Sequence, residues 1–237
     1  MHLQQFPRFH YPPSVIGAMT MPRRHTISVT LPPHGGEGLL GLPGEKPKGI
    51  VLFAHGSGSS RLSPRNTMVA AALQQAGLAT LLFDLLTDAE AAERSNVFDI
   101  PLLAERLDLA AGWVVDAAAT RDLPLGFFGA STGAAAALVA AAGRPDVGAV
   151  VSRGGRPDLA GDALTQVKAP TLLIVGGADP VVLDLNRQVQ RLMRCECRLE
   201  VVPGATHLFE EPGALEAVVA LARIWFETHL VPTEVVR

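Results

Sequence analysis

Short runs of apolar residues, many of them leucine or β-branched, recur along this 237-residue chain, and longer segments with helical spacing separate them. This alternation is typical of βαβ units, in which helices connect the parallel strands of one sheet. The run Gly49–Ala54 is apolar throughout, as expected for a strand that helices cover on both faces. The pattern therefore predicts an α/β fold built on a mostly parallel sheet.

The runs predict about eight strands and five or six helices, with helices on both faces of the sheet. Strands are expected at His25–Leu31, Gly38–Leu42, Gly49–Ala54, Ala79–Phe83, Leu125–Phe128, Val147–Val151, Thr171–Val175 and Cys197–Val202. Helices are expected at Pro64–Ala76, Leu102–Thr120, Thr132–Ala142, Asp184–Met193 and Gly213–Phe226. The first two strands flank a Pro-Pro-His-Gly-Gly turn and should therefore pair antiparallel.

These elements are expected to form a single domain over residues 25–232. The first residues of the chain are rich in glutamine, proline, histidine and phenylalanine, so residues 1–24 are expected to form a flexible N-terminal arm. The uncharged stretch Leu123–Gly143 is long enough to cross a bilayer. However, Gly-Ala-Ser-Thr-Gly lies in its middle, which favours a buried strand, a sharp turn and a buried helix.

The composition excludes several classes of protein. Apolar residues make up 48% of the chain and charged residues 18%, which excludes intrinsic disorder. The net charge of −3 argues against a nucleic-acid partner. The two cysteines, Cys195 and Cys197, cannot supply a disulfide framework or a metal site by themselves. The first 22 residues contain no continuous apolar run of a signal peptide, so we expect a cytoplasmic protein with no membrane partner.

The candidate nucleophile is Ser131, within Gly129-Ala130-Ser131-Thr132-Gly133. This G-x-S-x-G motif lies between a predicted strand and a predicted helix, the context in which a tight turn exposes a serine hydroxyl. The dipole of the following helix favours negative charge that develops there. The alternative is a glycine-rich strand–helix turn without chemistry, because short patterns also recur by chance.

Two further residues favour the chemical interpretation. A serine hydroxyl needs a base, and the base needs an orienting acid. Asp179 lies in the first loop after the predicted strand Thr171–Val175, and His207 lies in the first loop after Cys197–Val202. All three side chains should meet at the carboxyl edge of the sheet, in the chain order Ser, Asp, His. Asp184 is a weaker candidate than Asp179, because it fits the start of a helix.

A glycine-rich loop follows the strand Gly49–Ala54, with the sequence His-Gly-Ser-Gly-Ser-Ser at residues 55–60. Such a loop can supply one backbone N–H group of an oxyanion hole, here that of Ser57, while the residue after the nucleophile, Thr132, supplies the other. A phosphate-binding role is the alternative, but the loop matches neither nucleotide-binding glycine motif.

Together these stretches resemble the α/β-hydrolase superfamily and, within it, the dienelactone-hydrolase-like proteins, over about residues 48–230. The resemblance rests on HGSGSS at 55–60, FGASTG at 128–133, SRGGRPDLA at 152–160, GGADPVV at 176–182 and PGATHLFEEPG at 203–213. It implies the α/β-hydrolase fold, a Ser131–His207–Asp179 triad and hydrolysis of an ester or similar acyl bond. Dienelactone hydrolases proper use a cysteine nucleophile, and the serine here favours a general carboxylesterase. Similar domains occur alone or joined to a phosphoribosyltransferase-like domain.

Substrate specificity is expected to come from loops at the carboxyl edge of the sheet. Arg153 and Arg156 follow a predicted strand and could bind a carboxylate or phosphate of the substrate, although an ion pair with Asp158 is the alternative for them. His55 is a further candidate for substrate binding. Residues 85–101 form a long connection that either covers the site as a small cap or packs at the surface.

The sequence therefore predicts a serine hydrolase that cleaves carboxylic esters of small acyl groups through an acyl-enzyme at Ser131. No cofactor and no metal ion are implied. A thioesterase or a perhydrolase would use the same three residues, and a non-catalytic binding module with this fold is an alternative from another class. The expected partner is a small-molecule ester, and the chain should act as a monomer or homodimer.

Overall fold

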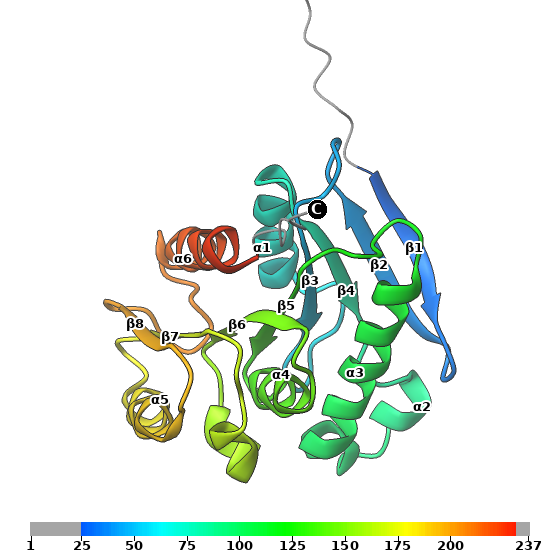
Figure 1. Ribbon diagram of the computed structural model, residues 1–237. Coiled ribbons are helices and arrows are strands. Elements are labelled where there is room, and N and C mark those ends of the chain that lie inside the picture. Colours follow the sequence, from blue (N-terminus) through cyan, green and yellow to red (C-terminus); the bar gives the residue numbers. More distant parts are fainter. Residues whose placement is uncertain (1–24, 231–237) are drawn as a thin grey trace, which may run out of the picture.

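The computed structural model describes residues 25–230 and contains one eight-stranded sheet in the order β1-β2-β4-β3-β5-β6-β7-β8 (Figure 1). The strands are β1 (His25–Leu31), β2 (Gly36–Leu42), β3 (Ile50–Ala54), β4 (Ala79–Phe83), β5 (Leu125–Ala130), β6 (Val147–Arg153), β7 (Thr171–Gly176) and β8 (Cys197–Val202). β1 pairs antiparallel with β2, and β2 pairs antiparallel with β4, whereas all other neighbours are parallel. The predicted sheet is thus confirmed, and the predicted arm at residues 1–24 lies outside the described residues, as do residues 231–237.

Helices cover both faces of the sheet, as Figure 1 shows. The helical elements are α1 (Pro64–Gln75), α2 (Asp88–Ala91), η1 (Asn96–Phe98), α3 (Ile100–Asp116), α4 (Thr132–Gly143), η2 (Pro157–Thr165), α5 (Pro180–Leu192) and α6 (Ala214–His229). One apolar cluster joins the sheet to α3, α4 and α5, and a second joins the opposite face to α1 and α6. The central strands β3, β4, β5 and β7 are fully buried, because helices remove both of their faces from water.

The predicted helices differ from the observed ones at their ends, and the largest differences, of four residues, are in α3 and α5. α3 ends at Asp116 instead of Thr120, because Ala117 is extended and the Thr120 hydroxyl donates to the carbonyl of Val114 at 2.6 Å. α5 begins at Pro180 instead of Asp184, because Asp179 caps this helix and a proline suits its first turn. Both differences arise from capping contacts, which hydrophobic spacing does not report.

The uncharged stretch 123–143 forms the buried strand β5 and the buried helix α4, as predicted. None of the helices between residues 25 and 230 is long and apolar enough to span a membrane. The loops that follow the parallel strands β3, β5, β6, β7 and β8 meet at one edge of the sheet. This carboxyl edge is where sheets of this kind bind ligands.

Candidate active site

Ser131 forms the sharp turn between β5 and α4. Its backbone has φ 51° and ψ −121°, a positive-φ conformation that costs a non-glycine residue about 1–3 kcal/mol. The flanking positions must be glycine, because neighbouring backbone atoms lie too close for a side chain. A Cβ on Gly129 would lie 2.4 Å from the Cα of Ala134. A Cβ on Gly133 would lie 2.2 Å from the carbonyl oxygen of Ala54. The motif therefore holds a strained turn at the tip of a central strand, at the N-terminus of a 12-residue helix.

Asp179 and His207 are paired in the structure. The Nδ1 atom of His207 lies 2.8 Å from Oδ2 of Asp179. The other carboxylate oxygen, Oδ1, accepts from the N–H of Val182 at 3.4 Å, because Asp179 is the N-cap of α5. The negative charge of Asp179 is thus placed at a helix N-terminus, where it is stabilised. With Nδ1 bound to a carboxylate, the Nε2 atom of His207 is left to act as the base.

Contacts between the two loops bring this pair together. The N–H of Ala178 donates to the carbonyl of Ala205 at 2.9 Å, and a Cβ on Gly176 would lie 2.3 Å from that same oxygen. Beyond the histidine, Phe209 is 1% exposed and has a positive φ of 56°. The Asp179 and His207 loops are therefore packed backbone against backbone, and the buried Phe209 ring anchors the second loop.

The glycine-rich loop 55–60 lies against the Ser131 turn. A Cβ on Gly56 would lie 2.9 Å from Cβ of Ser131. The N–H of Ser57 donates to Oγ1 of Thr132 at 3.0 Å. The backbone N–H of Thr132 belongs to the first turn of α4 and so has no partner within the helix. The structure thus places both predicted oxyanion-hole residues together, but the Ser57 donor is engaged by a threonine hydroxyl.

His55 connects this loop to the segment after β4. Its Nε2 atom accepts from the N–H of Leu85 at 3.1 Å, which puts the ring proton on Nδ1, 3.0 Å from the carbonyl of Gly56. Burial lowers the pKa of His55, in keeping with a neutral ring. Both nitrogens are therefore committed to backbone groups, and only the ring face is left for a ligand.

A cavity of about 280 Å³ opens beside the Ser57–Thr132 contact. The loop 55–61 forms one wall, and residues from 84 to 97 form the other. Apolar side chains from the second wall are Leu85, Leu86, Ala91 and Val97. Arg61 and Asp84 also line the cavity, and the Arg61 guanidinium forms an ion pair with Asp84 Oδ2. The backbone N–H of Arg61 also donates to Asp84 Oδ1 at 2.7 Å. The cavity is thus partly apolar, and it reaches Thr132, the residue that follows the candidate nucleophile.

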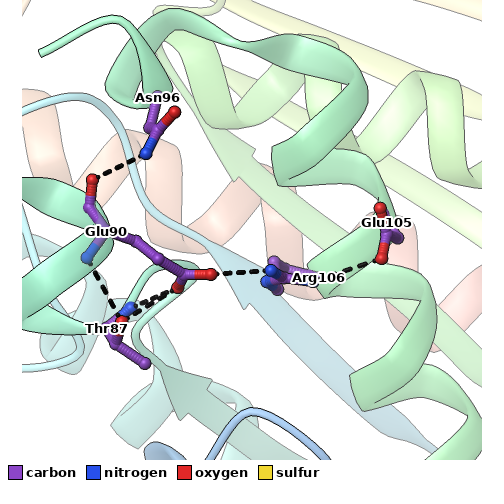
Figure 2. Close-up of polar contacts among 5 residues, drawn as sticks. All are labelled: Thr87, Glu90, Asn96, Glu105 and Arg106. Atoms are coloured by element: carbon purple, nitrogen blue, oxygen red, sulfur yellow. Dashed lines mark hydrogen bonds and ion pairs between the residues drawn. The ribbon is translucent and has the colours of Figure 1, made fainter. Parts of the chain in front are cut away.

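The segment 84–98 is fastened to α3 by a polar cluster (Figure 2). Thr87 caps α2, and the Glu90 side chain accepts in return from the N–H of Thr87 at 2.9 Å. Arg106 on α3 donates to Glu90 at 2.7 Å, and Asn96 donates to the Glu90 carbonyl at 2.9 Å. The hydrogen bonds from Thr87 and from the Arg106 guanidinium lower the pKa of Glu90 to about 2. Its carboxylate therefore stays charged, and the bond to Arg106 persists at any ordinary pH.

The two arginines predicted to bind substrate do not line this cavity. Arg156 forms a two-pronged ion pair with Asp158, with N–O distances of 2.9 and 2.7 Å, which is the alternative that the sequence left open. Arg153 is 6% exposed, and its closest side-chain partner is Oδ1 of Asn66, at 3.4 Å from Nη2. Burial and the nearby Arg65 lower the pKa of Arg153 to about 10. Arg153 is therefore a buried cation to which no carboxylate is paired within residues 25–230.

Arg153→Met is expected to raise the melting temperature by about 3–6 °C, because it removes a buried charge and keeps an apolar chain of similar length. The folded-state pKa of Arg153 is depressed, so its charge opposes folding below pH 10 and less so above. The gain should therefore shrink above pH 10, as thermal unfolding from pH 7 to 10.5 would show. Arg156→Met, at an exposed ion pair, should change the melting temperature by less than about 2 °C. A lower melting temperature for Arg153→Met would contradict this account.

Comparison with known proteins places these features in a family. A family model described as an alpha/beta hydrolase domain matches residues 47–218. The crystal structure of a dienelactone hydrolase from Anabaena variabilis is 55% identical, with a TM-score of 0.84, and the match covers 89% of this chain and 99% of that chain. This chain belongs to the dienelactone-hydrolase-like α/β hydrolases. The resemblance inferred from the sequence motifs is therefore confirmed.

More distant structures share the fold of this hydrolase. A dienelactone hydrolase-like promiscuous phosphotriesterase from metagenomic libraries has a TM-score of 0.71 at 18% identity and covers 88% of this chain and 99% of its own. Among curated proteins, one from Mycobacterium tuberculosis with the provisional name phosphoribosyl transferase is 61% identical over 209 residues. That match covers 88% of this chain and 47% of the relative, so the hydrolase spans about half the length of the curated relatives it matches.

Several features of this site have no signal in the sequence of the hydrolase. The ion pairs of Arg61 with Asp84 and Glu37 join residues that are more than 20 positions apart. The bond from Ser57 to Thr132 joins residues 75 positions apart. One signal was available, because Asp84 directly follows β4 and so had to lie at the carboxyl edge.

Proposed function

We propose that this hydrolase cleaves carboxylic esters of small acyl groups through an acyl-enzyme at Ser131. The observation that carries the proposal is the pairing of Asp179 with His207 at 2.8 Å, at the same sheet edge as the strained Ser131 turn. A non-catalytic member of the fold has no need of a carboxylate–imidazole pair and a strained serine together.

The proposed reaction follows the usual course of a serine hydrolase. The oxygen of Ser131 forms a bond to the acyl carbon while Nε2 of His207 takes the serine proton, and the carbonyl electron pair moves onto the carbonyl oxygen. Collapse of this intermediate breaks the ester C–O bond, and the imidazolium returns the proton to the leaving alcohol. Asp179 stabilises the imidazolium throughout. Water then repeats the same steps to release the acid.

The cavity beside Thr132 is proposed to hold the acyl group. Its volume of about 280 Å³ is at the lower limit of ordinary ligand pockets, which suits a short chain. Four apolar side chains from residues 85–97 line it, so we propose that the segment 85–101 acts as a small cap. The curated relatives are about twice as long as this chain, and we infer that the transferase activity in their name belongs to the half that this chain does not match.

A fluorophosphonate probe tests the nucleophile directly. We expect one probe per chain by intact mass, and peptide mapping should place the adduct on Ser131. In parallel, p-nitrophenyl esters from acetate to octanoate should be hydrolysed with a preference for the short chains. Absence of both labelling and turnover would contradict the proposal and favour a binding module.

Arg106→Met is expected to loosen the segment 84–98, which forms one wall of the cavity, because the substitution removes the bond that holds Glu90 to α3. KM for p-nitrophenyl acetate should rise about 3–10-fold while kcat changes less than about 3-fold, and tolerance of longer chains should increase. Arg144→Met is the matched control, because Arg144 is similarly half-buried but pairs with Asp108 and Asp146, which lie outside the segment 84–98. Equal changes in KM for both variants would argue against a role of the segment 84–98 in substrate binding.

A further inference from the structure

The Thr132 hydroxyl occupies a position between the oxyanion-hole loop and the cavity. The N–H of Ser57 donates to its Oγ1 atom at 3.0 Å, and Thr132 also lines the cavity. Thr132 as a whole is only 5% exposed, and helix α4 holds its backbone. This buried hydroxyl is therefore held at the cavity wall, on the residue next to Ser131.

Among the described residues, the Thr132 hydroxyl accepts a hydrogen bond but does not donate one. A threonine hydroxyl has one proton to donate and two lone pairs to accept. Oγ1 of Thr132 accepts from Ser57, yet within residues 25–230 its own proton has no acceptor. A buried hydroxyl proton next to a cavity is available to a ligand in that cavity. The bond from Ser57 also polarises the hydroxyl and makes it a better donor.

We propose that the Thr132 side chain is a catalytic residue that donates its hydroxyl hydrogen bond to the oxyanion of the substrate. The inference rests on the proposed esterase function. The Ser57 N–H then acts through Oγ1 of Thr132, and the backbone N–H of Thr132 supplies a second direct donor. No proton is transferred in this contact: the serine proton still passes to His207, and Thr132 only stabilises charge on the carbonyl oxygen.

If the Thr132 hydroxyl were only a placeholder, it would occupy the oxyanion hole of the free enzyme and would have to leave Ser57 before the reaction. This role predicts the opposite result. Removal of the hydroxyl would then free the Ser57 N–H, and turnover would stay constant or rise. The sign of the change in kcat therefore separates a donor from a placeholder.

The test compares Thr132→Val, which keeps the shape and the backbone N–H, with Thr132→Ser, which keeps the hydroxyl. For p-nitrophenyl acetate we expect kcat of Thr132→Val to fall about 100-fold with KM within about 3-fold, whereas Thr132→Ser stays within about 3-fold of wild type. Unchanged or faster turnover of Thr132→Val would overturn the proposal. If the valine variant does not fold, Thr132→Ala decides by the same criteria, because α4 is already rich in alanine.

A second measurement reports the oxyanion without turnover. A trifluoromethyl ketone adds to the serine and forms a stable oxyanion, so its affinity should fall about 100-fold in Thr132→Val, in parallel with kcat. Equal affinity for wild type and variant would reject the donor role. Failure of the proposed function itself would look different, because wild type would then neither hydrolyse esters nor react with the fluorophosphonate probe.

Discussion

Ser131→Ala is expected to lower kcat for p-nitrophenyl acetate by about 10⁴–10⁶-fold. The variant keeps the two residues of the proposed oxyanion hole and the His207–Asp179 pair but has no atom that can form the proposed acyl-enzyme. Initial rates of the two proteins, at matched concentration and after removal of any contaminating esterase, measure the effect. The fluorophosphonate probe should leave the variant unlabelled.

Ser152→Ala is the matched control for this prediction. Ser152 is fully buried on the neighbouring strand β6, where it pairs in register with Gly129, and its hydroxyl has no hydrogen-bond partner among the described residues. Its removal should leave both turnover and labelling unchanged. Wild-type turnover by Ser131→Ala would show that another residue is the nucleophile.

Gly133→Ala is expected to have the largest effect on the structure. The added Cβ would lie 2.2 Å from the carbonyl oxygen of Ala54 and 2.5 Å from that of His55. Both atoms belong to backbone, so the methyl group can fit only if the loop after β3 or the start of α4 moves. We expect a loss of at least about 3 kcal/mol in the free energy of unfolding, which is about 6–12 °C in melting temperature.

The same displacement should reduce catalysis in the molecules that remain folded. The loop 55–57 carries the Ser57 donor, and a shift of about 1 Å in a catalytic group lowers turnover by about 100-fold. Thermal unfolding and kcat below the transition measure the two effects. Gly143→Ala in the same helix is the control, because its added Cβ would meet no atom within 4 Å and should raise the melting temperature slightly. Similar losses for both variants would contradict the steric explanation.

The candidate triad could be predicted because each member is local to a strand end. Ser131, Asp179 and His207 each follow a buried apolar run, and parallel strands deliver their following loops to one edge. The fold follows from the same periodicity, and the errors in α3 and α5 arose at helix ends, where capping bonds decide the boundary.

The arginines show where such reasoning fails. Arg153 and Arg156 both follow β6 at the correct edge, but Arg156 pairs with Asp158 and Arg153 is buried beside Asn66. The direction of a side chain depends on what packs above it, and a strand pattern does not contain that information. The charged residues that line the cavity are instead Arg61, Asp84 and Asp88, on segments that meet only in the folded chain.

The amino-acid sequence by itself determined the α/β architecture, the serine turn and the order of the three candidate catalytic residues. These features depend on hydrophobic periodicity and on glycines within a few residues of each other. Only the tertiary structure decided that Ser57 donates to Thr132, that His55 is bound to the backbone of Leu85, and that residues 84–97 form a wall of the cavity. Each of those contacts joins distant segments, and its geometry is fixed by how the loops pack on the finished sheet.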